Sequence, residues 1–283
     1  MDSYHYTSSY GIFGIINSCQ LHCSNANFLN DPTEQNYFDS ILKEVISKNS
    51  ACKNIYKILY NNSVESHIIN PFENYVISFC KNKDSLSMWS HYAKGNGYNL
   101  GFNIDSIIKR NNHNFFSIKK VDLIYSRPDQ INILKRYILS HKDNSAKYLL
   151  LENTKTLAQK NDARNSYDEA NYEQDNYLID FSSGLFEMKL KFKHEAFKRE
   201  EEIRLVVCPD ESKEITTSHK ISSTGIIIEY VSLALKLSED LTSITMHPLN
   251  SDLHTIGMKR FLNTKVNNKI IDIGKSEIPL RLI

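Results

Sequence analysis

Glycine is scarce in this sequence, with 9 glycines among 283 residues. Loops that bind nucleotide phosphates need closely spaced glycines, because only glycine lets the backbone approach the phosphate closely. No such glycine fingerprint occurs, and its absence argues against a P-loop and against a doubly wound dinucleotide-binding fold. The same scarcity excludes a collagen-like repeat.

Long apolar runs and a cysteine framework are also missing. No segment approaches about eighteen consecutive apolar residues, so no membrane-spanning helix is expected. The 5 cysteines are odd in number and irregularly spaced, which favours reduced thiols over a disulfide framework. Because residues 1–7 also lack the basic and apolar parts of a secretory signal, we expect a cytoplasmic protein without membrane contact.

Neither sign of charge dominates, since 34 Lys and Arg residues face 33 Asp and Glu residues and the formal net charge is +1. This balance argues against a protein that coats nucleic acid or binds membranes through a polybasic surface. The 10 histidines are scattered, and neither an H-E-x-x-H nor a C-x-x-C segment occurs. We therefore expect no metal site.

Hydrophobic periodicity predicts strands on both sides of a helical middle. Strands are expected at 4–7, 20–23, 74–80, 98–103, 118–125, 203–208, 225–230, 244–246 and 269–273. Helices are expected at 10–17, 33–47, 51–65, 85–92, 104–110, 176–197, 231–240 and 252–262, and an interrupted helical region is expected at about 127–159. The polar residues 161–176 are typical of a mobile insert or hinge. The order favours one α+β domain over 1–283, with a mixed, largely antiparallel sheet and a helical insertion at about 128–197.

The first predicted strand carries a candidate binding residue. His5 can donate a ring hydrogen bond, and Thr7 would then lie beside the same polar ligand. A histidine at the edge of the core, with no ligand, fits the same residues.

A charged segment, Glu200–Arg204, lies where a later strand begins. Alternation along a strand would put Glu200, Glu202 and Arg204 on one face. Two carboxylates there suit acid–base work or the stabilisation of a cationic sugar, with Arg204 orienting one of them. A solvated ladder of charges is the alternative interpretation.

The helix predicted at 85–92 contains the only tryptophan, Trp89, together with Tyr92. Its rings suit stacking on a flat heterocycle, and a helix that packs its aromatic residues into the core is the alternative. Ser78, in the strand before this helix, adds a hydroxyl to the candidate site.

Taken together, the segments resemble an uncharacterised bacterial family of domains of unknown function. The motifs of that family occur here in order as His5–Ser8, Leu29–Glu34, Ser78–Cys80, Ser87–Tyr92, Gly101–Phe102 and Glu200–Arg204. Two positions depart from the family pattern: Cys80 replaces a serine, and Phe197 stands where a tryptophan is common.

The segment Tyr4–Thr7, with the helix predicted after it, also resembles the start of ADP-ribosyltransferases of the His-Tyr-Glu type. Tyr6 stands where those enzymes have glycine. The resemblance implies an ADP-ribosyltransferase-like fold and NAD as the substrate. It implies that His5 holds a ribose hydroxyl beside Thr7, and that an aromatic ring of the 85–92 helix stacks on nicotinamide.

The same resemblance makes Glu202 the catalytic carboxylate, while Glu200 would activate the acceptor and Arg204 would hold a carboxylate or a diphosphate. The expected catalytic residues are therefore His5, Tyr92, Glu200 and Glu202. The expected NAD-binding residues are His5, Thr7, Ser78, Trp89 and Arg204.

The expected activity is cleavage of the nicotinamide–ribose bond and transfer of ADP-ribose to a protein or nucleic acid. The family resemblance favours a toxin or phage-defence effector, with an antitoxin or another defence protein as a partner. A non-catalytic module that binds nucleotides or nucleic acid is one alternative, with phosphate contacts from Arg204, Arg281 and Lys189–Lys193. A metal-dependent nuclease is the other, with ligands from Asp31, Glu34, Glu200 and Glu202.

Overall fold

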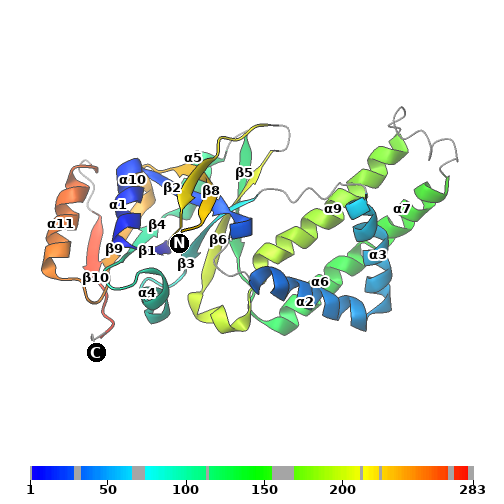
Figure 1. Cartoon of the computed structure of the whole chain (residues 1–283), viewed down its shortest axis with the longest axis horizontal. Coiled ribbons are helices and arrows are strands. Elements are labelled where there is room, and N and C mark those ends of the chain that lie inside the picture. The colour runs from blue at the N-terminus through cyan, green and yellow to red at the C-terminus, as the bar shows by residue number, and fades with distance from the viewer. Residues whose placement is uncertain are drawn as a thin grey trace. The chain divides into compact units, whose positions relative to one another are not determined.

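A computed structural model describes residues 2–28, 33–65, 74–112, 115–154, 169–210, 213–222, 225–266 and 271–279 (Figure 1). The fold is α+β with a mixed, mostly antiparallel sheet, which confirms the predicted class. The strands are β1 (Ser3–Thr7), β2 (Gln20–Asn25), β3 (Tyr75–Cys80), β4 (Tyr98–Phe102), β5 (Phe116–Asp122), β6 (Glu202–Pro209), β7 (Ser218–Ile221), β8 (Ile227–Ala234), β9 (Leu241–Met246) and β10 (Asp272–Lys275). The α-helices are α1 (Ser9–Ser18), α2 (Thr33–Lys48), α3 (Ser50–Glu65), α4 (Leu86–Tyr92), α5 (Ile104–Asn111), α6 (Arg127–Ser140), α7 (Lys142–Thr154), α9 (Glu169–Lys191), α10 (Leu237–Asp240) and α11 (Asp252–Asn263). Two 3₁₀-helices are η1 (Ala26–Phe28) and η2 (Glu195–Glu200).

The chain divides into two compact units. A sheet unit consists of Met1–Asn30, Glu73–Leu123 and Ala196–Ile283, and a helical unit consists of Asp31–Phe72 and Ile124–Glu195. Most of the insertion expected at about 128–197 lies in the helical unit, which also includes the earlier segment with α2 and α3. No helix in the described part of the chain is both long and apolar enough to cross a membrane.

The helical unit packs α2, α3, α6, α7 and α9 around one apolar core, which includes Ile41, Leu134 and Phe181. The hinge expected at 161–176 is wrong for 169–176, because these residues form the first turns of α9. Their polar sequence conceals a buried position, since the Gln174 side chain donates to the Tyr148 carbonyl oxygen at 3.2 Å. Residues 155–168 lie outside the described residues.

In the sheet unit, β3 is a junction between two groups of strands. One of its edges pairs with β6 from Tyr75 to Cys80. The opposite edge is shared, because β1 pairs with it at Cys80 and β2 pairs with it at Tyr75 and Val76. The strands β1, β4, β9 and β10 therefore diverge from β2, β8 and β7, and the main chain of Ser78 lies between the two groups.

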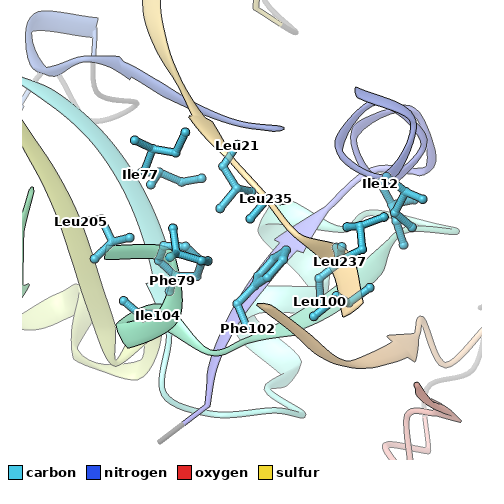
Figure 2. Packing of buried hydrophobic residues seen from close by; sticks show 14 of the residues in the cluster. Ile12, Leu21, Ile77, Phe79, Leu100, Phe102, Ile104, Leu205, Leu235 and Leu237 are labelled. Carbon is cyan, nitrogen blue, oxygen red and sulfur yellow. The ribbon is translucent and has the colours of Figure 1, made fainter. Parts of the chain in front are cut away.

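One face of this sheet builds the core of the unit. Ile77, Phe79, Leu100 and Phe102 lie in one buried cluster with Ile12 of α1 (Figure 2). The cluster forms because alternate residues of β3 and β4 are apolar, and alternate side chains of a strand point to the same face.

Two elements differ from the sequence expectation near the chain's C-terminal third. The helix expected at 231–240 is wrong in its first half, where β8 continues to Ala234 with Val231 and Leu233 buried opposite β2. Only α10 is helical there. The strand β7 was not predicted, because an edge strand pairs on one side only and buries few of its side chains.

Candidate functional site

The centre of the candidate site is a buried ion pair on β6. Ser78 of β3 is the register partner of Arg204, and Cys80 is the partner of Glu202, so Ser78, Glu202 and Arg204 share one face. The Ser78 hydroxyl donates to Glu202 Oε1 at 2.5 Å, and Arg204 Nε donates to the same oxygen at 2.7 Å. Glu202 is 6% exposed and Arg204 is 1% exposed. The carboxylate is therefore held in one orientation by charge-assisted hydrogen bonds.

Glu200 does not lie on the strand, contrary to the sequence expectation. It ends η2, and the next residue, Glu201, has a left-handed backbone with φ 43°, so strand alternation begins only at Glu202. Glu200 instead accepts a hydrogen bond from the Tyr92 hydroxyl of α4 at 3.0 Å. The second carboxylate of the predicted pair thus belongs to the same region but is held by a helix.

His5 is linked to the site by a hydrogen bond to the main chain of Ser78. Its register partner on β4 is Leu100, and its ring lies 5.8 Å from that of Phe79, so its side chain points to the apolar face. The Ser78 and Glu202 side chains point to the opposite face. His5 Nδ1 donates to the Ser78 carbonyl oxygen at 3.0 Å, in the gap where β1 and β2 diverge. Because a carbonyl oxygen only accepts, the proton is on Nδ1.

Burial also lowers the pKa of His5, so the neutral ring is favoured. Nε2 is then a hydrogen-bond acceptor. Thr7 lies on the same side of β1 as His5 and pairs with Tyr98 of β4. Neither side chain lies on the face that carries Glu202.

Trp89 has no exposed surface, contrary to the role expected for it in stacking on a ligand. It is 0% exposed, its indole nitrogen donates to Asp84 at 2.6 Å, and its ring packs against the edge of Tyr6. An aromatic residue at this position is used for packing, because its ring is a large apolar surface. Tyr92, which is 36% exposed, is the ring of α4 that a ligand can reach.

Arg204 binds the Glu202 carboxylate, which is one of the two partners expected for it. Its burial removes it from contact with an external diphosphate, the other expected partner. Among the described residues, no group of three or more His, Cys, Asp and Glu side chains is placed to hold a metal ion. Asp31, Arg281 and the side chain of Glu34 lie outside the described residues.

A second set of polar groups, on β2, β7 and β8, was not predicted from the sequence. The ring of His22 on β2 stacks on Tyr230 of β8 with centroids 4.0 Å apart. The ammonium group of Lys220 on β7 lies 5.5 Å from the Tyr230 ring centroid. The three residues come from distant segments, and one of them lies on the strand that was not predicted, so no local pattern joined them.

Residues 88–205 contain a domain that matches the family model described as "Protein of unknown function (DUF2971)". The matched segment runs from α4 to β6 and includes Tyr92, Glu200, Glu202 and Arg204. This match confirms the expected resemblance to an uncharacterised family over residues 88–205. No curated protein and no solved structure matches the chain, so the ADP-ribosyltransferase resemblance rests on the residues alone.

Proposed function

We propose that the protein cleaves the nicotinamide–ribose bond of NAD and transfers ADP-ribose to a macromolecule, with Glu202 as the catalytic carboxylate. The observation that supports this proposal is the fixed orientation of Glu202 between Ser78 and Arg204. A preorganised charge stabilises a transition state well, because the protein does not have to reorganise when the charge of the substrate changes.

The chemistry requires a negative group near the ribose. When the bond between the nicotinamide nitrogen and ribose C1′ breaks, the electron pair leaves with neutral nicotinamide and positive charge develops on the ribose. The Glu202 carboxylate stabilises that charge. A nucleophile of the acceptor then bonds to C1′, and its proton passes to Glu200, which acts as the general base.

Tyr92 and His5 support these two carboxylates. The Tyr92 hydroxyl orients Glu200 through the 3.0 Å hydrogen bond, and its exposed ring offers a surface for the nicotinamide. We assign His5 a positioning role rather than the ribose contact that the resemblance implies. Its ring fixes the main chain of Ser78, and Ser78 in turn holds Glu202.

The biological role belongs to the same proposal. A cytoplasmic toxin or phage-defence effector would modify a protein or a nucleic acid, and an antitoxin or another defence protein would restrain it. The chemistry at Glu202 is the same for either acceptor, because the acceptor enters only after the bond to nicotinamide is broken.

The experiment is incubation of the full chain with NAD and a mixture of proteins and nucleic acids, followed by mass analysis of nicotinamide and of the modified acceptor. Glu202→Gln should lower nicotinamide release on the order of a hundredfold or more, because a preorganised electrostatic group is lost. The matched control is Glu201→Gln, which makes the same chemical change at the exposed neighbouring residue and should leave the rate unchanged.

Circular dichroism of both variants separates lost chemistry from lost structure. Full activity of a folded Glu202→Gln variant would contradict the assignment of the catalytic residue. Absence of nicotinamide release from the unaltered chain, together with salt-sensitive binding of nucleic acid, would favour the binding module. Activity on nucleic acid that a chelator abolishes would favour the nuclease.

A further inference from the structure

On one face of the strands β2, β8 and β7, Lys220 is the only side chain with a formal charge. Register pairs Ser24 with both Val76 and Tyr230, pairs His22 with Ser232, and pairs Lys220 with Ile228. Paired residues of antiparallel strands share a face, so His22, Ser24, Tyr230, Ser232 and Lys220 lie on the same face as Ser78. This is also the face that carries Glu202 and Arg204.

No carboxylate on these three strands shares that face. The only acidic residue in β2, β7 and β8 is Glu229, which points to the opposite face and accepts a hydrogen bond from the Tyr75 hydroxyl. No ion pair of Lys220 is found within the described residues, and its ammonium group lies over the ring of Tyr230. Burial lowers the pKa of Lys220, and burial together with the nearby charge of Lys220 lowers the pKa of His22.

A half-buried cation without a carboxylate is costly to the folded state. The cost is offset when a ligand supplies the missing negative charge. The hydroxyls of Ser24 and Ser232 lie on the same face, half-buried, and make no hydrogen bond within the described residues. Together with the ammonium group they provide donors of the kind that phosphate oxygens require.

The position of this face fits a substrate whose reacting bond lies at Glu202. Ser24 of β2 pairs with Val76, whose partner on β6 is Val206, so β2 lies two strand spacings or about 10 Å from β6 at that level, and Glu202 lies four residues further along β6. Arg204 is occupied by Glu202 and buried, so another cation has to neutralise the phosphates of a dinucleotide.

We propose that Lys220 and His22, with the hydroxyls of Ser24 and Ser232, bind the diphosphate of a dinucleotide substrate. The identification of the substrate as a dinucleotide rests on the proposed function. The binding of an anion rests on the geometry of the face. The ring of Tyr230 contacts both side chains, through the stack with His22 and through the approach of the Lys220 ammonium group.

Binding of inorganic pyrophosphate to the full chain tests the site without any turnover. Isothermal titration at low salt should show binding that Lys220→Met weakens at least tenfold. Lys275→Met is the matched control, because it removes the same charge from an exposed position on β10, at the other end of the sheet. The NMR signal of the His22 ring should shift on addition of pyrophosphate in the unaltered chain.

Steady-state kinetics of NAD cleavage distinguish a failure of the anion site from a failure of the proposed function. Lys220→Met should raise KM for NAD at least tenfold, leave kcat unchanged, and leave the cleavage of nicotinamide riboside, which has no phosphate, unaffected. If NAD is not cleaved at all but pyrophosphate binds through Lys220, the proposed function fails and the anion site stands. If Lys220→Met binds pyrophosphate as well as the unaltered chain, the anion site fails whatever the activity.

A third outcome would also overturn the assignment. An oligonucleotide that binds through Lys220, with no binding of pyrophosphate, would replace the dinucleotide by a nucleic-acid backbone. Should Lys220→Met not fold, Lys220→Gln removes the charge while keeping a polar end on the side chain, and the same three measurements apply.

Discussion

The ion pair of Glu202 with Arg204 stabilises the fold only as a pair. Both side chains are nearly excluded from solvent, and desolvation of two charges is offset by their mutual attraction and by the hydrogen bond from Ser78. Removing one partner removes the attraction that offsets the desolvation of the other charge. The carboxylate that we propose as catalytic is thus also a structural residue, and its neighbours can be used to separate the two roles.

Arg204→Met should lower the free energy of unfolding by about 3–5 kcal/mol, because it leaves the Glu202 carboxylate buried without its cation. Ser78→Ala keeps both charges and should cost only about 1–2 kcal/mol for the lost hydrogen bond. Urea unfolding of the two variants measures both values. A larger loss for Ser78→Ala than for Arg204→Met would show that the hydroxyl, and not the charge pair, dominates.

At the scale of single residues, part of the candidate site could be predicted from the sequence. The alternation of Glu202 and Arg204 could be predicted, because two residues of one strand share a face whatever their neighbours are. The placement of Glu200 could not, because it depends on the left-handed backbone of Glu201, which is not a glycine and gives no local signal. Trp89 was expected to bind NAD and is buried instead, because its helical spacing fits a core position as well as a ligand-binding position.

Among the elements, α4 and β1 are positioned by a close approach of the main chain at Gly97. A Cβ atom on this residue would lie 2.5 Å from the Thr7 carbonyl oxygen and 2.6 Å from Ala93 Cα. The same glycine carbonyl accepts hydrogen bonds from the His247 amide and the Asn250 side chain. The strand that carries His5 and the helix that carries Tyr92 therefore depend on one residue without a side chain.

Gly97→Ala should lower the free energy of unfolding by about 1–3 kcal/mol, because the added methyl group forces the backbone of α4 away from β1. It should also lower nicotinamide release if Tyr92 is displaced. Gly274→Ala is the control, since among the described residues, its two chain neighbours aside, no atom lies within 4 Å of a Cβ built there. Thermal unfolding of both variants gives the comparison, and equal midpoints would contradict the role of Gly97.

Most elements could be predicted because their burial pattern is local, as in β3, where five of the six residues are buried. The way they pair could not be predicted. That β1 and β2 share one edge of β3 depends on contacts between segments more than fifty residues apart, and no periodicity records them. That His22, Tyr230 and Lys220 share one face of β2, β8 and β7 could not be predicted for the same reason.

At the scale of the whole molecule, burial lowers the pKa of four histidines in the described part of the chain, which are His5, His22, His141 and His247. The unfolded chain therefore binds more protons than the folded chain once the pH falls below about 6.5, the ordinary value for histidine. The stability that these histidines contribute above about pH 6.5 is lost as the pH falls towards their lowered pKa values in the folded state.

The midpoint of thermal unfolding should thus fall steadily between about pH 7 and pH 5. His247→Asn should reduce this dependence, because its Nδ1 accepts a hydrogen bond from the Leu249 amide at 3.2 Å and cannot do so when protonated. The control is His219→Asn. Because His219 is exposed, this change should leave the pH dependence of the unfolding midpoint as it is in the unaltered chain. A midpoint that is constant over this range would contradict the direction of these pKa shifts.

The division of each unit into separate segments has a consequence for synthesis. On the ribosome, α2 and α3 emerge long before α6 and α9, which complete their core, and β3 emerges well before its partner β6. A nascent chain that stalls between Leu123 and Glu202 carries β3 with a bare edge, which is a template for pairing with other chains. Interrupted translation of this protein should therefore produce aggregates rather than small folded fragments.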